Sequence, residues 1–249
     1  MSKLNPENHK EIYEHYSQFV YSERIQNFGF AVMHHLFKCE VHYIDEASET
    51  IQSHLNDQGS LIIAMNHQSN CDVPTISAMV YEETIAPCKG KTIIPAKAEL
   101  FDLPVIGKLI PHMQAHPTFR YNNFSRDEKG DLLREQANNM LIKLNIDHIN
   151  NGGHVAIFPE STRNKSDPSE VQELKRGIGR IALGVDDPSK LLITAMGCAY
   201  KSEWPIKHRP IVVVGEPFSP EGMEQGDMIE ETRKRIQSVT TKAFSLISK

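Results

Sequence analysis

The chain lacks most of the features that mark secreted, membrane-spanning or nucleic-acid-binding proteins. Only four of its 249 residues are cysteine, and these are scattered without a C-x-x-C pair. No apolar run reaches the roughly 18 residues that a bilayer-spanning helix needs. The formal net charge of −5 leaves no basic excess to attract nucleic acid. With neither disulfide spacing nor a signal peptide, the sequence predicts a reduced, cytoplasmic protein with no transmembrane span.

The composition that remains is typical of a folded α/β domain. Apolar residues make up 39% and charged residues 24% of the chain. From residue 60 onward, short β-rich runs alternate with helical patterns, which predicts a largely parallel mixed sheet covered by helices in a single domain. The expected strands are Ser60–Asn66, Lys91–Pro95, His154–Phe158, Leu191–Ala199 and Pro210–Gly215. The expected helices are Pro74–Thr84, Asp131–Ile149, Glu170–Gly184 and Asp227–Ile247.

Residues 1–45 are predicted to form a helical extension that precedes an α/β domain at 46–249. Asn5-Pro6-Glu7 is a suitable helix start, with a capping side chain, a proline in the first turn and an acidic residue near the positive end. Gly29 is a candidate break between two helices. The apolar pattern fits a helix packed on the core, which we favour, and also an amphipathic element that lies on a membrane.

The most informative motif is Asn66-His67-Gln68-Ser69-Asn70-Cys71-Asp72, directly after the apolar run 61–65. Five positions on a helix turn by about 500°, so His67 and Asp72 can meet only if His67 precedes the helix. Ser69 and Asn70 suit that turn. Asp72 would then lie at the positive end of the helix and could hold one ring nitrogen of His67, which leaves the other as a base.

Two other interpretations apply to this motif. His67 and Asp72 could simply cap a turn, because the bare spacing arises often by chance. Ser69 or Cys71 could instead act as a nucleophile beside His67, as in an acyl-thioester hydrolase. Neither has an elbow such as G-x-S-x-G, and Cys71 suits a small buried residue at a helix start.

A second polar cluster, Pro159-Glu160-Ser161-Thr162-Arg163, follows the apolar run that ends at Phe158. Ligands of open α/β sheets bind at the carboxyl ends of the strands. The planar guanidinium of Arg163 suits a phosphate, and Ser161 and Thr162 add hydroxyl donors. Glu160 could accept from a substrate hydroxyl or hold Arg163, while an ordinary surface turn with salt bridges is the alternative.

Taken together, the two clusters resemble the motifs of the glycerolipid acyltransferases, a family that acylates glycerol 3-phosphate and 1-acylglycerol 3-phosphate. Residues 66–72 resemble the first motif, and Phe158–Arg163 resemble the F-P-E-G-T-R motif. The family also has segments similar to the one around Lys97, to Lys175-Arg176-Gly177 and to the strand 211–217. The resemblance therefore covers about residues 55 to 220. The chain departs from the family at Ser161, where a glycine is usual.

Two further departures concern the middle and fourth motifs. The family's G-x-x-F-x-x-R motif has only Phe119-Arg120 as a counterpart here. The strand 192–197 lacks the usual proline of the fourth motif.

The resemblance implies acyl transfer from acyl-CoA or acyl carrier protein to a glycerol-phosphate hydroxyl. It implies His67 as the general base, Asp72 as its orienting partner, and acceptor binding by Glu160, Ser161, Thr162 and Arg163, with Lys97 and Arg120 as further phosphate ligands. The acyl thioester is a co-substrate, and no metal or other cofactor is expected. A bilayer-resident lysophospholipid acceptor would bring the N-terminal helices into peripheral membrane contact. A non-catalytic lipid-binding protein is the remaining alternative.

Overall fold

The computed structural model describes residues 4–120, 123–200 and 209–247. In that part of the chain, seven strands form one sheet in the order β1-β7-β6-β2-β5-β3-β4. All neighbours pair in parallel except β6 and β7, so the predicted, largely parallel mixed sheet is confirmed. The strands are β1 (Glu40–Tyr43), β2 (Ser60–Met65), β3 (Thr92–Lys97), β4 (Ala115–Thr118), β5 (His154–Ile157), β6 (Leu191–Ala199) and β7 (Ile211–Val214).

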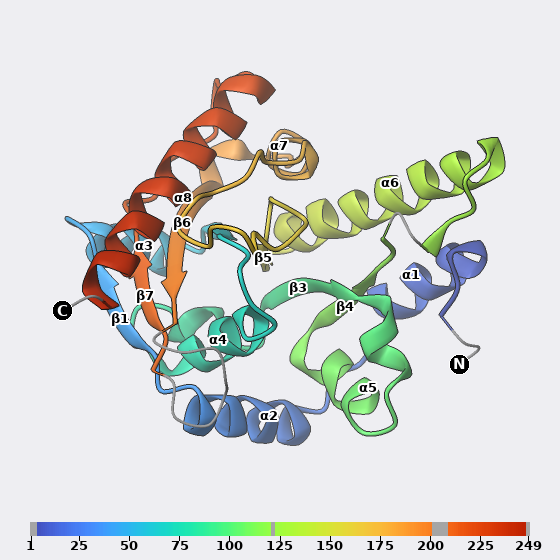
Figure 1. Cartoon of the computed structure of the whole chain (residues 1–249), viewed down its shortest axis with the longest axis horizontal. Coiled ribbons are helices and arrows are strands. Elements are labelled where there is room, and N and C mark those ends of the chain that lie inside the picture. Colours follow the sequence, from blue (N-terminus) through green and yellow to red (C-terminus); the bar gives the residue numbers. More distant parts are fainter. Residues whose placement is uncertain (1–3, 121–122, 201–208, 248–249) are drawn as a thin grey trace.

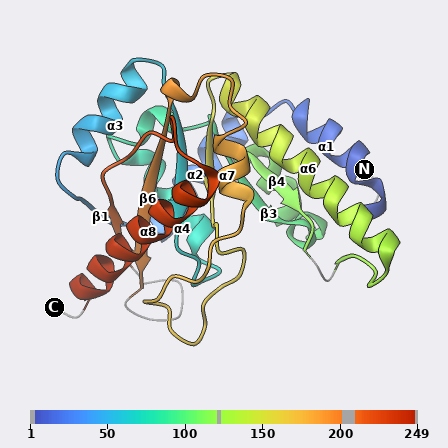
Figure 2. The same ribbon diagram turned by 90° about the horizontal axis from the view of Figure 1, so that it is seen from above.

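Helices cover both faces of this sheet (Figure 1). The α-helices are α1 (His9–Ser17), α2 (Glu23–Leu36), α3 (Ala47–Asn56), α4 (Asp72–Ala78), α5 (Ile106–Leu109), α6 (Glu128–Asn150), α7 (Gly177–Ala182) and α8 (Gln225–Ile247). Short 3-10 turns lie at Pro6–Asn8, Met79–Tyr81, Ala86–Cys88, Ala98–Asp102, Ile110–Met113 and Pro188–Lys190. Helices α6, α7 and α8 lie next to one another across one face, as Figure 2 shows.

Alternate residues of the strands supply two separate hydrophobic cores. In β2, Ile62 and Ala64 belong to the core under α1, α6, α7 and α8, whereas Leu61, Ile63 and Met65 belong to the core under α3 and α4. Every residue of β2 is therefore buried. A strand with both faces covered reads as a continuous apolar run, which is why β2 and β6 were predictable from sequence.

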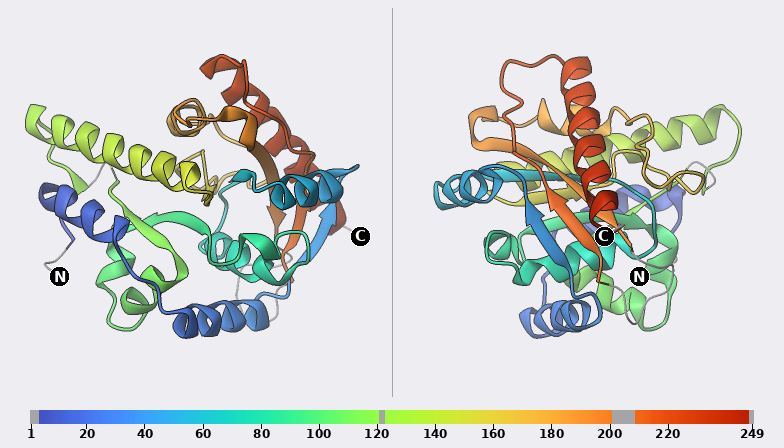
Figure 3. Two further views of the ribbon diagram at one scale, coloured as in Figure 1. Left: turned by 180° about the vertical axis from the view of Figure 1, so that it is seen from behind. Right: turned by 60° about the vertical axis from the view of Figure 1, so that its left-hand side comes forward.

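Helix α8 packs closely on β6 and β7 (Figure 3). A Cβ atom at Gly197 of β6 would lie 2.3 Å from the backbone carbonyl carbon of Val239. Only glycine fits at this crossing, because any side chain would push α8 off the sheet. Gly197 therefore lets α8 lie directly against β6.

The N-terminal region is helical as predicted, with two differences in detail. The break lies between α1 and α2, and Gly29 sits buried inside α2 with the Sδ atom of Met113 3.0 Å from its Cβ position. Strand β1 lies within residues 1–45 and pairs with β7, so that range also contributes to the sheet. Helix α1 packs its buried side chains Ile12, Tyr13 and Tyr16 into the core, as favoured.

Other differences have local causes. The predicted helix Glu170–Gly184 is wrong over its first half, because the backbone amides of Val171 and Gln172 donate to Gln237 and Glu160. Helix α4 begins two residues before Pro74 and ends at Ala78. Strands β1 and β4 and helix α3 were not predicted. In β4, His116 and Pro117 interrupt the apolar pattern on which a strand prediction depends.

Candidate functional site

Five parallel strands end at the same edge of the sheet, and each brings a polar residue there. His67 follows β2, and the segment 158–163 follows β5. Lys97 is the last residue of β3, and Arg120 lies two residues after β4. Because β4, β3, β5, β2 and β6 all run in the same direction, these separate segments of sequence gather at one carboxyl edge.

The predicted His–Asp pair forms at this edge. The Nδ1 atom of His67 lies 2.7 Å from Oδ2 of Asp72, and their side chains are 13% and 0% exposed. Helix α4 begins at Asp72, so His67 lies in the turn before it, as the spacing required. No described residue forms a hydrogen bond with Nε2 of His67, so this nitrogen is free to act on a substrate proton.

Asp72 is buried but fully hydrogen-bonded. Its Oδ2 atom also accepts from the backbone amides of Gln68 and Ser69, each at 2.9 Å, and Oδ1 accepts from the hydroxyl of Tyr200 at 2.8 Å. Four donors compensate the loss of water around this carboxylate. The contact with Oδ2 of Asp72 fixes the tautomer of His67 that carries its proton on Nδ1.

Glu160 supports the His67 turn from the neighbouring strand β5. Its Oε1 atom accepts from the backbone amide of His67 at 2.7 Å, and Oε2 accepts from the amide of Gln172 at 2.9 Å. The residue is 2% exposed, and burial raises the pKa of its carboxyl. Both oxygens are thus occupied by backbone donors. The structure shows Glu160 as a brace for the His67 backbone, and its predicted contact with the acceptor stays a prediction.

Other residues of the second motif also contact the first. The ring of Phe158 lies 4.7 Å from the ring of His67, and the amide of Asn164 donates to the His67 carbonyl at 3.0 Å. Ser161 and Thr162 are exposed at the turn between these contacts. Ser161 has a φ of 62°, in the left-handed region that favours glycine. The positive φ at this position explains why the related motif usually has a glycine here.

A group of positive side chains lies beside this turn. Partial burial lowers the pKa of Lys97, and the charges of Arg120, Arg163 and Lys165 lower it further, while the nearby Glu99 raises it. Mutual repulsion of this kind means that the four cations share one region. We call Lys97, Arg120, Arg163 and Lys165 the basic cluster. It suits an anionic group such as a phosphate.

The alternative nucleophiles are not arranged for attack. The hydroxyl of Ser69 accepts from the amide of Cys71 at 3.1 Å, and in the described chain neither side chain is hydrogen-bonded to His67. Cys71 stands at the N-cap of α4. A nucleophile activated by His67 would need contact with the ring nitrogen that Asp72 leaves free.

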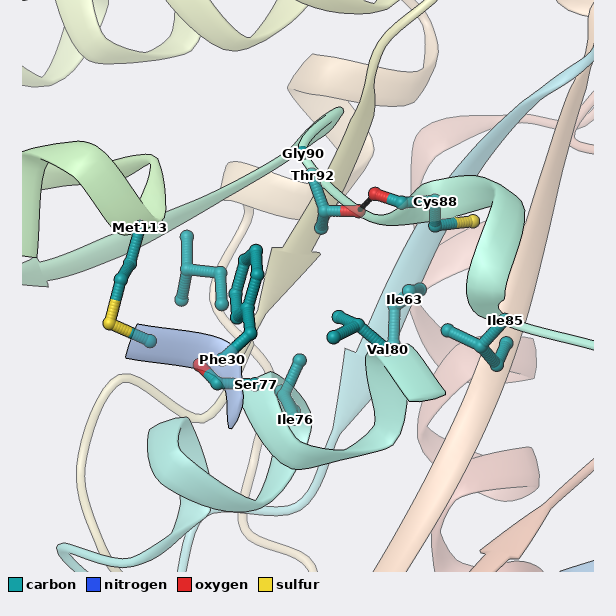
Figure 4. A pocket seen from close by; sticks show the side chains of 11 residues that line it. Phe30, Ile63, Ile76, Ser77, Val80, Ile85, Cys88, Gly90, Thr92 and Met113 are labelled. Atoms are coloured by element: carbon teal, nitrogen blue, oxygen red, sulfur yellow. Dashed lines mark hydrogen bonds between the residues drawn. The ribbon is translucent and has the colours of Figure 1, made fainter. Parts of the chain in front are cut away.

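An apolar cavity of about 20 Å³ lies behind α4 (Figure 4). Its walls come from α2, β2, α4 and β3 and include Phe30, Ile63, Ile76, Ser77, Val80, Ile85, Cys88, Gly90, Thr92, Ile94 and Met113. The volume holds about one water-sized sphere.

No group of three or more His, Cys, Asp or Glu side chains within the described ranges could hold a metal ion. No helix among the residues that the structure describes has the length and apolar character to cross a bilayer.

The sequence did not single out the end of β6, which completes the site. Asn66 bonds the backbone of Cys198 through both amide atoms, at 2.7 and 3.2 Å, and Gln68 donates to the same carbonyl. Tyr200, the next residue but one, reaches Asp72. The sequence could have indicated Tyr200 by its position, because it directly follows a strand that was predicted with its correct bounds.

The acyltransferase family model matches residues 44–199, from the residue after β1 to the last residue of β6. No curated protein sequence gives a significant match to the chain.

Proposed function

The chain belongs to the acyltransferase family of glycerolipid-type enzymes, which transfer acyl groups. On this basis we propose a specific reaction for it. The enzyme moves a fatty acyl group from acyl-CoA or acyl carrier protein to a hydroxyl of a glycerol-phosphate acceptor. The favoured acceptor is 1-acylglycerol 3-phosphate, which gives phosphatidate, with glycerol 3-phosphate or another lysophospholipid as the alternative. The observation that carries the proposal is the His67–Asp72 pair beside the basic cluster.

In the proposed mechanism, Nε2 of His67 takes the proton of the acceptor hydroxyl. The oxygen attacks the thioester carbonyl, the C–S bond breaks, and the thiolate leaves with the proton from His67. Asp72 stabilises the imidazolium that forms between these two steps. A general base of this kind contributes about 10²–10⁴-fold to the rate. No covalent acyl-enzyme is required, in keeping with the positions of Ser69 and Cys71.

In this proposal, the basic cluster binds the phosphate of the acceptor. Arg163 offers a bidentate fork to a phosphate, and Lys97 and Arg120 add positive charge. Arg163 belongs to the same turn as Glu160 and Asn164, whose bonds to the His67 backbone are short. A phosphate held by this cluster would bring a nearby glycerol hydroxyl to the base, which supplies the orientation on which the reaction depends.

Peripheral membrane contact is part of the same proposal. Large apolar side chains are exposed on and before α2 and around α5: Val20 (86%), Phe28 (65%), Val105 (77%) and Ile106 (50%). Helix α2 contacts α5, and both lie along one side of the molecule (Figure 1). A lysophospholipid acceptor and a long-chain product both partition into lipid, so that this side would rest on the bilayer.

Thiol release from acyl-CoA and from acyl carrier protein, measured with each acceptor and followed by product mass, tests the reaction. His67→Ala should lose about 10²–10⁴-fold in turnover while its unfolding temperature stays unchanged. Near-normal turnover by that variant would sink the mechanism. Acyl release to water without any acceptor, together with an acyl adduct by intact mass, would point to a hydrolase instead.

Arg163→Ala tests the acceptor site. Its KM for a phosphorylated acceptor should rise about tenfold or more, the loss expected when a charged hydrogen bond of roughly 1.5–3 kcal/mol is removed. Arg180→Ala, on α7 and bonded to Asn139, is the matched control. An unchanged KM in Arg163→Ala would exclude the phosphate role.

Liposome flotation tests the membrane contact with the full-length protein. The double variant Phe28→Ser/Val105→Ser should bind liposomes more weakly than the wild type. Leu132→Ser/Leu183→Ser, which changes exposed leucines on and beside α6 and α7, should bind as the wild type does. Equal flotation of both double variants would remove the proposed docking side.

A further inference from the structure

Tyr200 lies at the site but outside every recognised motif. It is the first residue after β6 and lies one residue past the family match. Its hydroxyl is 2.8 Å from Oδ1 of Asp72 and 3.1 Å from Oγ1 of Thr75. The two oxygens of Asp72 therefore have different partners: Oδ2 faces His67, and Oδ1 faces Tyr200.

The direction of these hydrogen bonds follows from the chemistry of the groups. An ionised carboxylate can only accept, so the Tyr200 hydroxyl donates to Asp72. The phenol oxygen then accepts from the Thr75 hydroxyl. Burial raises the pKa of Tyr200 well above its usual range, and Cys198 and Asp72 raise it further, so the phenol keeps its proton. The result is a chain of donors from Thr75 through Tyr200 to Asp72.

We propose that Tyr200 is a positioning residue that holds the Asp72 carboxylate in the plane of the His67 ring and limits the base strength of His67. The inference rests on the proposed function, because it assigns a role within the His67–Asp72 pair. A carboxylate held only through Oδ2 could rotate about its Cβ–Cγ bond. The hydroxyl also withdraws negative charge from Asp72, so that less charge is available to stabilise the imidazolium.

Other titratable groups face the pair, but from other sides. Glu160, from the β5 turn, acts on both His67 and Asp72 through its charge. Cys198, inside β6, lies close enough to Asp72 for the carboxylate to raise the pKa of its thiol, and Cys39 and Cys71 act on that thiol more weakly. Among the described residues, Tyr200 provides the hydrogen bond to Oδ1. Its removal therefore changes one interaction of Asp72 and leaves the others in place.

The test uses Tyr200→Phe in the full-length enzyme, which removes only the hydroxyl. We expect kcat to fall about tenfold, which corresponds to roughly 1.4 kcal/mol of barrier, with KM for the acceptor unchanged. The acidic limb of the kcat/KM profile should move to higher pH, because Asp72 regains charge and His67 becomes more basic. The low-field proton resonance of His67 Nδ1–H should shift in the resting enzyme.

Tyr43→Phe is the matched control. This half-buried tyrosine is the last residue of β1, at the far edge of the sheet, and donates its hydroxyl to the carboxylate of Glu82. We expect it to leave both the pH profile and the His67 resonance unchanged. Thr75→Val, which keeps Tyr200 and weakens its donor chain, should shift both readouts in the same direction but less, and it serves in place of Tyr200→Phe if that variant does not fold.

The outcomes separate this inference from the proposed reaction. If His67→Ala is inactive but the Tyr200 and Thr75 variants keep the wild-type acidic limb and His67 resonance, the role of Tyr200 is overturned and the reaction stands. A lower kcat without either shift would mean a merely structural role and would also overturn the proposal. If His67→Ala retains turnover, the reaction itself is wrong.

Discussion

Histidines lie at both ends of the parallel sheet, and their surroundings differ. At the carboxyl edge, His67 is 13% exposed and is bonded to the carboxylate of Asp72. Near the amino edge, His154 begins β5, is 2% exposed, and accepts the backbone amide of Leu61 at 3.1 Å. His54 and His148 nearby donate to backbone carbonyls, those of Ser60 and Lys91. The comparison shows that partner and exposure, and not residue type, separate a base from a structural histidine.

His154 stays neutral for a physical reason. Burial lowers the pKa of His154 to about 4, and the positive charges of His148, Lys91 and His54 add to that effect. The ring therefore accepts a backbone hydrogen bond that a protonated imidazole could not accept. Without a carboxylate to stabilise its charged form, such a ring cannot hold a proton during a reaction, whereas His67 can.

The largest expected effect contrasts one histidine from each edge. His67→Gln should lose about 10²–10⁴-fold in turnover with little change in stability. His154→Leu should keep its turnover per folded molecule but lose roughly 1–3 kcal/mol of unfolding free energy, because the amide of Leu61 is left unpaired. Thiol release measures the turnover of both variants, and urea unfolding measures their stability. If both variants lost turnover and unfolding free energy to the same extent, the proposed difference between the two histidines would be wrong.

Acid stability gives the next effect. The pKa of His154 falls from 6.5 unfolded to about 4 folded, so the unfolded chain binds the extra proton between these values. Stability should therefore be complete above about pH 6.5 and decrease as the pH falls toward 4, by up to about 3 kcal/mol from this group. His116, with a pKa of about 3 because of its burial, acts in the same direction.

Urea unfolding between pH 7 and pH 4 measures this dependence. His154→Leu should have a flatter curve than the wild type, while His42→Leu, which changes an exposed histidine, should not. Parallel curves for wild type and His154→Leu would show that His154 is not the responsible group.

At the carboxyl edge, Glu160→Gln should separate bracing from substrate contact. The amide can accept from only one of the two backbone amides, so a charge-assisted bond worth about 1.5–3 kcal/mol is lost. We expect a lower kcat and lower stability with an unchanged acceptor KM. Glu170→Gln, at an exposed position, is the control. An increase in the acceptor KM alone would indicate that Glu160 contacts the acceptor directly, as the sequence predicted.

The smallest effect concerns the turns on either side of β5. The chain enters this strand through Gly152, with φ at 78°, and the turn after it contains Ser161, with φ at 62°. Ser161→Gly should raise the unfolding free energy by about 1 kcal/mol, because a left-handed conformation is strained for a residue with a Cβ atom. Ser53→Gly, inside α3, should lower it by a similar amount. Thermal melts of the two variants decide the sign.

The site could be predicted where its residues are close in sequence. The position of His67 in a turn before the helix followed from its spacing to Asp72, although α4 begins two residues before the predicted start at Pro74. The strand bounds of β6 and the apolar run of β2 followed from burial on both faces. Strand β4 and the extended segment 170–176 could not be predicted, because their hydrogen-bond partners, such as Gln237 and Glu160, lie far away in the sequence.

The sequence by itself determined the parallel sheet, the His–Asp turn and the family motifs, because apolar periodicity and short-range spacing are local properties. Only the tertiary structure decided what each polar group does. It turned Glu160 inward as a brace, gathered Lys97, Arg120 and Arg163 into one basic cluster, and brought Tyr200 to the second oxygen of Asp72. The physical reason is that parallel strands share one carboxyl edge, so that residues more than a hundred positions apart become neighbours.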